Sequence, residues 1–76
     1  MKRLARSARE WQGLEIAATV KLRRMAECWI VPSQTGPLSY AVNPTAGWCT
    51  CTDYQIRKVK CKHLWAVEFT AERENA

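Results

Sequence analysis

Four residues of this chain belong to types that bind transition metals, and they lie in two close pairs. One residue separates Cys49 from Cys51, and after a spacer of nine residues Cys61 and His63 repeat that spacing. Side chains two residues apart project from the same face of an extended segment but diverge on a helix. We therefore expect Cys61 just before a helix and His63 in its first turn. Sulfur and imidazole donors at four tetrahedral corners bind structural zinc, so we expect one Zn²⁺ ion with no coordination position left for catalysis.

A chain of 76 residues is short enough to need such an ion. Small domains bury little apolar surface, and a metal or disulfides commonly complete their stability. Zinc binding and folding are then expected to be one event, worth about 10–16 kcal/mol. Disulfides would require secretion, but Arg6, Arg9 and Glu10 interrupt any apolar stretch near the start. We expect reduced cysteines, a cytoplasmic location, and a buried, unreactive thiol at Cys28.

The elements that would position these ligands follow from hydrophobic periodicity. Residues 3–25 predict one amphipathic helix, and its stripe comprises Leu4, Ala8, Trp11, Leu14, Ala18, Leu22 and Met25. Ile16 and Val20 lie off this stripe beside Gly13, which weakens the helix by about 1 kcal/mol relative to Ala. The two apolar residues indicate either a second packing surface for a protein partner or a homodimer, or scattered surface residues.

The rest of the chain predicts a short sheet and a second helix. Strands are expected at 27–32 and 38–42, a turn at 43–47 precedes Trp48, and a helix covers 62–73. Trp65 and Phe69 on that helix either pack against Trp11 and Leu14 or stack on bases of a nucleic acid. The fold class is a small α+β zinc-stabilised domain with an N-terminal amphipathic helix, an antiparallel β-hairpin or meander, the zinc site and a C-terminal helix. We divide the chain into a basic helix at 1–26, a zinc module at 27–73 and a tail at 74–76.

The net charge of +5 is concentrated in two blocks. Residues 1–24 have a net charge of +5 and residues 57–62 a net charge of +4, whereas residues 25–56 contain no Lys or Arg. Such blocks are typical of proteins that bind an anionic partner. The candidate nucleic-acid contacts are Arg57, Lys58, Lys60, Lys62, Arg6, Arg9, Arg23 and Arg24. The cations at 57–62 also offset the negative charge of three thiolates, and both roles remain open.

The ligand pattern resembles the SWIM zinc finger, which occurs in bacterial helicase-related ATPases, Mutator-type transposases and some recombination accessory proteins. The similarity extends over about half the chain, through residues 29–34, 40–42, 49–54 and 61–69. This longer string resembles the N-terminal region of prokaryotic transposases of the acidic-triad (DDE) class. Thr52 stands where the family has Pro, which affects only local loop geometry.

The resemblance implies a zinc module of the prokaryotic cytosol or nucleoid that binds DNA, as part or relative of a transposase. The alternative is a protein-interaction module that docks a recombinase or a second copy of itself. The transposase catalytic domain is absent from these residues, and no catalytic residue set is present because the only histidine is a metal ligand. We therefore expect no enzymatic activity, no small-molecule substrate and no membrane association.

Overall fold

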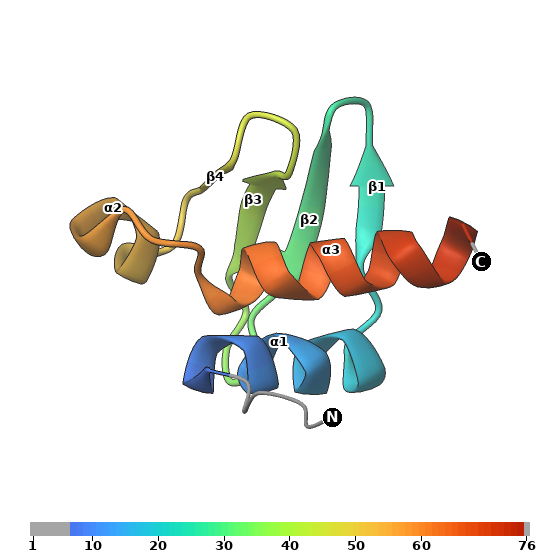
Figure 1. The fold of residues 1–76 in the computed structure, drawn as a ribbon, viewed down its shortest axis with the longest axis horizontal. Helices are drawn as coiled ribbons and strands as arrows, with labels where there is room; N and C mark the ends of the chain where they lie inside the picture. The colour runs from blue at the N-terminus through green and yellow to red at the C-terminus, as the bar shows by residue number, and fades with distance from the viewer. Residues whose placement is uncertain (1–6, 76) are drawn as a thin grey trace, which may run out of the picture.

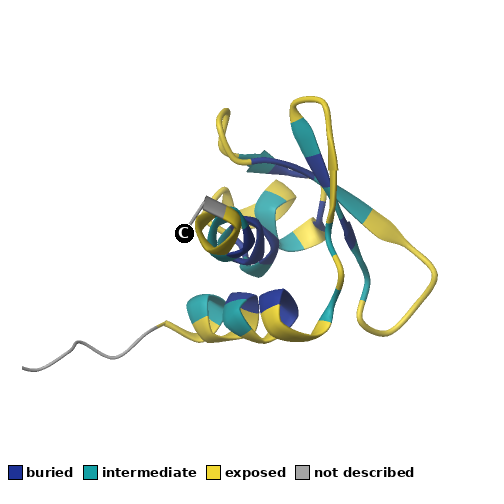
Figure 2. Ribbon diagram, turned by 90° about the vertical axis from the view of Figure 1, so that its right-hand side faces the viewer, coloured by how far each residue is buried: buried dark blue, intermediate teal, exposed yellow. Residues whose placement is uncertain are grey.

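The computed structural model describes residues 7–75, which form three helices and one antiparallel sheet (Figure 1). The elements are α1 (Ala8–Thr19), β1 (Arg23–Met25), β2 (Cys28–Pro32), β3 (Ser39–Asn43), β4 (Trp48–Cys49), α2 (Thr52–Arg57) and α3 (Lys62–Asn75). Helix α3 contacts strands β2, β3 and β4, and α1 packs along α3. Figure 2 shows the sheet on one side of the two long helices, with the buried residues between them.

The sheet has the strand order β1-β2-β3-β4 and is antiparallel throughout. Along β2, Trp29 and Val31 are buried and alternate with half-buried neighbours, as predicted for a strand covered on one face. Val42 of β3 lies opposite both Trp29 and Cys49, so one row of inward residues crosses three strands. The predicted meander is confirmed, and the same row of side chains leads directly to the first cysteine pair.

The first helix is shorter than the sequence predicts. Its N-cap is Ser7, whose hydroxyl accepts a hydrogen bond from the backbone N–H of Glu10, and it ends at Thr19 rather than at residue 25. Residues 23–25 pair with β2 instead, through a tight turn in which Ala26 has a φ of 51°. Pairing with β2 satisfies the backbone groups on one side of this segment, and the apolar spacing of Leu22 and Met25 is a misleading signal.

The buried face of α1 also differs from the predicted stripe. Gly13, Ile16 and Ala17 are buried, whereas Trp11 is 58% exposed. The contact partner of this face is α3, because a Cβ added at Gly13 would lie within 3.0 Å of the Ala66 nitrogen. The predicted docking surface at Ile16 and Val20 is therefore wrong for this chain: Ile16 is 1% exposed and Val20 packs against the same core. Leu4, the first residue of the predicted stripe, lies outside the described residues.

Helix α3 is the central element of the core. His63, Val67 and Thr70 are buried on the face turned to the sheet. Trp65 and Phe69 stack with their ring centroids 5.6 Å apart and are half-buried. The Arg73 guanidinium donates a hydrogen bond to the Ala17 carbonyl, which ties the far end of α3 to α1. Within residues 7–75, none of the helices has the length and apolar character required to cross a membrane.

Candidate metal centre

Four different structural positions bring the ligand side chains together. Cys49 ends β4, Cys51 is the N-cap of α2, Cys61 directly precedes α3 and His63 lies in the first turn of α3. The backbone N–H of Trp65 donates to the Cys61 carbonyl, so Cys61 caps α3 as Cys51 caps α2. The predicted placement of the second pair at a helix start is confirmed. Each ligand is fixed by an element boundary, where the backbone is already constrained by capping.

The ligand atoms fit a single zinc ion. The three sulfurs and the imidazole nitrogen lie within 4.8 Å of one another, and all four residues are buried. The Nδ1 atom of His63 is 3.7 Å from the Cys49 sulfur and 4.0 Å from the Cys61 sulfur, so Nδ1 is the donor aimed at the cluster. Bonds of about 2.3 Å to sulfur and about 2.0 Å to nitrogen put tetrahedral ligand atoms about 3.5–3.8 Å apart. The donor set is that of a structural zinc site, and both distances from His63 Nδ1 are within about 0.5 Å of this spacing.

The electrostatics of the cluster differ among its three sulfurs. A hydrogen bond from the Cys49 thiol lowers the pKa of Cys61 to about 4, helped by His63 and the backbone N–H of Leu64. The same hydrogen bond raises the pKa of Cys49, and burial raises the pKa of Cys51. In this arrangement Cys61 is the sulfur that ionises most readily, and the raised pKa values of Cys49 and Cys51 oppose their ionisation. A divalent cation supplies the charge that lets all three sulfurs ionise.

Groups around the ligands orient them and complete their hydrogen bonding. Backbone N–H groups donate to sulfur at 3.4 Å, from Cys51 to Cys49 and from Tyr54 to Cys51. The side-chain amide of Gln55 donates to the Cys49 carbonyl at 3.0 Å. The Tyr40 ring lies against the His63 imidazole, with centroids 4.5 Å apart. Such outer contacts hold ligands in place and tune the metal.

Helix α2 is the element of the site that periodicity does not predict. It has no buried residue, so it carries no apolar stripe. Its signals are local: Cys51 accepts from the Tyr54 N–H as a cap, and Asp53 is acidic in the first turn. The Arg9 guanidinium of α1 donates two hydrogen bonds to the Asp53 carboxylate, at 2.8 and 2.9 Å. These hydrogen bonds hold the pKa of Asp53 below its ordinary value.

The candidate nucleic-acid residues divide between two edges of the sheet. Arg23 and Arg24 belong to β1 at one edge, and Arg24 lies over the Trp29 ring. The residues from Arg57 to Lys62 follow β4 at the other edge (Figure 1). The Arg9 and Lys62 side chains line one groove there. Arg6 lies outside the described residues. Among the described residues, the first basic block is therefore divided: Arg9 lies with the second block, whereas Arg23 and Arg24 lie at the opposite edge.

Several of these cations already have partners. Arg9 and Arg57 share the Asp53 carboxylate, and Lys60 pairs with Glu68 at 2.7 Å while lying over the Trp65 ring. Lys58 is exposed, with its ammonium 5.3 Å from the Tyr54 ring centre. No ion pair between Lys62 and a carboxylate is found among residues 7–75.

Cys28 is separate from the metal cluster, as its position in β2 predicts. The expectation of full burial is wrong, because its side chain is half-buried on the side of β2 opposite Trp29. The sheet is covered by helices on the Trp29 face, so outward residues such as Cys28 keep partial contact with solvent.

A comparison with protein-family models matches residues 28–72 to the SWIM zinc finger. Comparisons with curated proteins and with solved structures found no match. The matched range includes all four ligands, begins at β2 and extends through most of α3. It omits α1, although α1 packs on α3 in the same core. A family model that covers more than half of the residues, together with a buried Cys/Cys/Cys/His cluster, establishes that this chain belongs to the SWIM zinc finger family.

Proposed function

We propose that this chain is a non-catalytic, zinc-stabilised module that binds DNA. The observation that carries the proposal is the cationic end, by which we mean Arg9, Arg57, Lys58, Lys60 and Lys62. Two carboxylates, Asp53 and Glu68, form ion pairs with cations of this set. Five cations and two carboxylates leave an excess of three positive charges at one end of the molecule. The zinc centre, with three thiolates and one Zn²⁺, offsets one of them.

The position of the cationic end favours a binding role over simple charge balance. Its loop runs from α2, capped by Cys51, to Cys61, so metal ligands fix the backbone close to both ends. A loop held in this way loses little conformational entropy when it binds a partner. Lys58 is exposed and Lys62 is half-buried, and both can reach phosphate. Contacts of this kind supply affinity and register but do not select a sequence.

The absence of catalysis is part of the proposal. Four protein ligands fill a tetrahedral zinc ion, so no position remains for a water molecule to be activated. The only histidine of the chain is one of these ligands. The similarity of residues 29–34, 40–42, 49–54 and 61–69 to transposase N-termini supports a place in DNA recombination. We accordingly propose that the module is the N-terminal part, or a relative, of a transposase.

The test compares two charge-matched double variants of the zinc-loaded chain. Lys58→Asn with Lys62→Gln removes two charges from the cationic end, and Lys21→Gln with Arg23→Gln removes two from the opposite edge of the sheet. Duplex affinity at low salt is expected to fall at least about tenfold in the first variant, and its log–log salt slope by about two, because two phosphate contacts are lost. Fluorescence anisotropy on labelled duplex measures both quantities.

The control variant is expected to lose less than about threefold in affinity. Equal losses in both variants would mean that only net charge matters, and unchanged affinity in both would refute the DNA-binding proposal. Circular dichroism of each zinc-loaded variant confirms that the fold is intact.

A protein-interaction module is the second candidate, and exposed apolar side chains favour it. Ile56 of α2 is 72% exposed and Trp11 of α1 is 58% exposed. A recombinase or a second copy of this chain could cover them. Light scattering at increasing concentration distinguishes self-association from a monomer. A constant monomer mass, unchanged by Ile56→Ser or Trp11→Ser, would eliminate the homodimer.

A further inference from the structure

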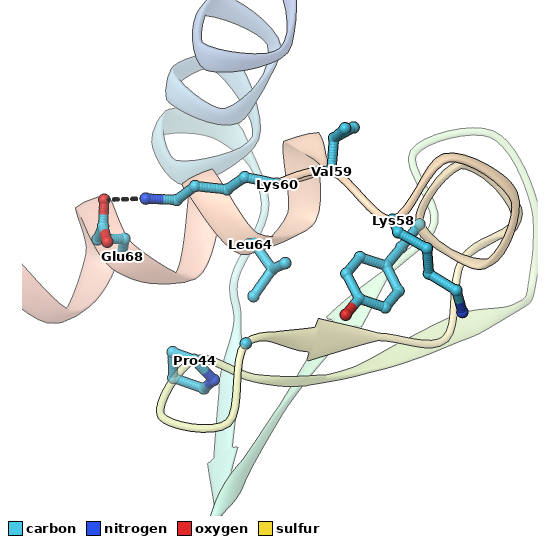
Figure 3. Close-up of a pocket in the computed structure, with 8 residues that line it drawn as sticks. Pro44, Lys58, Val59, Lys60, Leu64 and Glu68 are labelled. Atoms are coloured by element: carbon cyan, nitrogen blue, oxygen red, sulfur yellow. Dashed lines mark hydrogen bonds and ion pairs between the residues drawn. The ribbon is translucent and has the colours of Figure 1, made fainter.

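A cavity of about 310 Å³ opens beside the cationic end, between the β3–β4 turn and the start of α3 (Figure 3). Leu64 lies between the Lys60–Glu68 ion pair on one side and Lys58 on the other, with Pro44 across the cavity. Val59 and Tyr54 also line it. The cavity is therefore lined by apolar and charged side chains together, and its volume is at the lower end of the range for ligand sites.

Apolar and basic residues alternate along the segment that borders this cavity. Ile56 and Val59 are 72% and 42% exposed, and the residues between and after them are Arg57, Lys58 and Lys60. Phosphates of duplex DNA can pair with the cations, but stacked and paired bases leave the exposed apolar side chains in water. A single strand offers phosphates and unstacked bases together, and both kinds of side chain then have a partner.

We propose that this cavity binds an unpaired base of single-stranded DNA, with a neighbouring phosphate on Lys58. The inference rests on the proposed function and specifies the form of DNA that the module binds. The apolar side chains in this mixed lining favour a base that is itself partly apolar, and the thymine methyl group can contact Leu64, Val59 and Pro44. Glu68 neutralises Lys60, so among the described residues that line the cavity Lys58 is the cation without a carboxylate partner, which suits one phosphate rather than several.

The experiment separates bases from phosphates with four probes of equal length, about 15 units. They are oligothymidylate, an abasic deoxyribose-phosphate strand, a duplex and oligouridylate RNA, each measured by anisotropy with zinc-loaded protein. Oligothymidylate is expected to bind at least about fivefold more tightly than the abasic strand and the duplex. It should also bind about two- to threefold more tightly than oligouridylate, which lacks the methyl group.

A charge-preserving variant then tests the apolar residues. Ile56→Ser with Val59→Ser alters only exposed side chains, and Leu38→Ser is the matched control because Leu38 is 67% exposed on another loop. The double variant is expected to lose at least about fivefold in affinity for oligothymidylate and less than about twofold for the duplex. The control should bind all probes unchanged, and thermal melts show that each variant is folded.

The outcomes distinguish this inference from the proposed function. Equal affinity for oligothymidylate, the abasic strand and the duplex would overturn the inference while leaving phosphate binding intact. Binding of oligouridylate at least as tight as that of oligothymidylate would overturn the commitment to DNA. A double variant that still prefers oligothymidylate would show that the base lies elsewhere. Failure to bind any of the four probes would refute the proposed function itself.

Discussion

At the scale of single residues, Gly13 decides how closely the two long helices approach. A Cβ at this position would lie 3.0 Å from both the Ala66 nitrogen and the Lys62 carbonyl oxygen, and closer still to the Trp65 Cβ. Two of these atoms are backbone, which cannot move without shifting the start of α3. Because α3 begins next to the zinc ligands, the separation of α1 and α3 bears directly on the metal centre.

Gly13→Ala is therefore expected to destabilise the zinc-loaded domain, although Ala is the better helix former by about 1 kcal/mol. Forcing the helices apart costs about 1–3 kcal/mol in cases of overpacking, and it outweighs the gain in propensity. Gly36→Ala is the control, since a Cβ there meets nothing within 4 Å. Thermal unfolding with zinc in excess measures both variants. A Gly13→Ala protein more stable than the parent would show that α1 and α3 are not in close contact.

Residue identity alone predicts the ligands but not the role of this glycine. Cys49, Cys51, Cys61 and His63 are recognisable because their chemistry and spacing suit one ion. From the sequence alone, Gly13 is predicted only to weaken its helix. In the fold, it is the residue at which α1 contacts α3. The difference depends on α3, which lies about 50 residues further along the chain and cannot be inferred from the periodicity of α1.

At the scale of elements, the connection from α2 to α3 is shaped by one strained residue. Lys58 is the C-cap of α2 and has a φ of 55°, a left-handed conformation that favours glycine. Its N–H donates to the Tyr54 carbonyl and closes the helix. A residue that carries a useful charge thus occupies a position where glycine would fit the backbone better.

Two substitutions at Lys58 separate the backbone from the charge. Lys58→Gly and Lys58→Ala both remove the ammonium, but only glycine relieves the left-handed strain, so the Gly variant is expected to be more stable by about 1 kcal/mol. Chemical denaturation with zinc present measures this difference. Both variants should lose the same affinity for DNA, and unequal losses would show that loop conformation rather than charge determines binding.

Strands and helices differ in how well the sequence predicts them here. The strands at 28–32 and 39–43 and the helix from residue 62 follow from alternation, turn residues and the ligand pair. Helix α2 has no apolar stripe, and β1 looks like the end of α1 because Leu22 and Met25 continue the helical spacing while its three exposed residues show no alternation. Both missed elements are short and depend on neighbours: β1 on pairing with β2, and α2 on its cysteine cap and the Arg9–Asp53 ion pair.

At the scale of the whole molecule, the metal centre is the junction between layers. Cys49 belongs to the sheet, Cys51 to α2, and Cys61 and His63 to α3, so one ion connects three elements. Three of the cysteines are also members of the buried core cluster. The apolar residues around them, such as Val31, Val42 and Val67, form a small core, and a core of this size rarely stabilises a domain alone.

Removal of zinc with a strong chelator is accordingly expected to abolish cooperative thermal unfolding and to reduce helical circular dichroism. One equivalent of zinc should restore both. Cys49→Ser is expected to abolish the recovery, whereas Cys28→Ser, outside the cluster, should leave it intact. Retention of a cooperative transition in chelator would show that the helices and sheet fold without the ion.

The number of protons released when zinc binds shows whether the metal-free chain is folded or unfolded. In a folded metal-free site, Cys61 is already a thiolate at neutral pH because its pKa is about 4, while the raised pKa values keep Cys49 and Cys51 protonated. Zinc would then release about two protons, whereas an unfolded chain with three ordinary thiols would release about three. We expect the release of about three protons near pH 7. The affinity for zinc should fall as pH decreases, because protons compete with zinc for the sulfurs. Calorimetry in buffers of different ionisation enthalpy counts the protons, and a value of two would mean that the ligands assemble before the metal arrives.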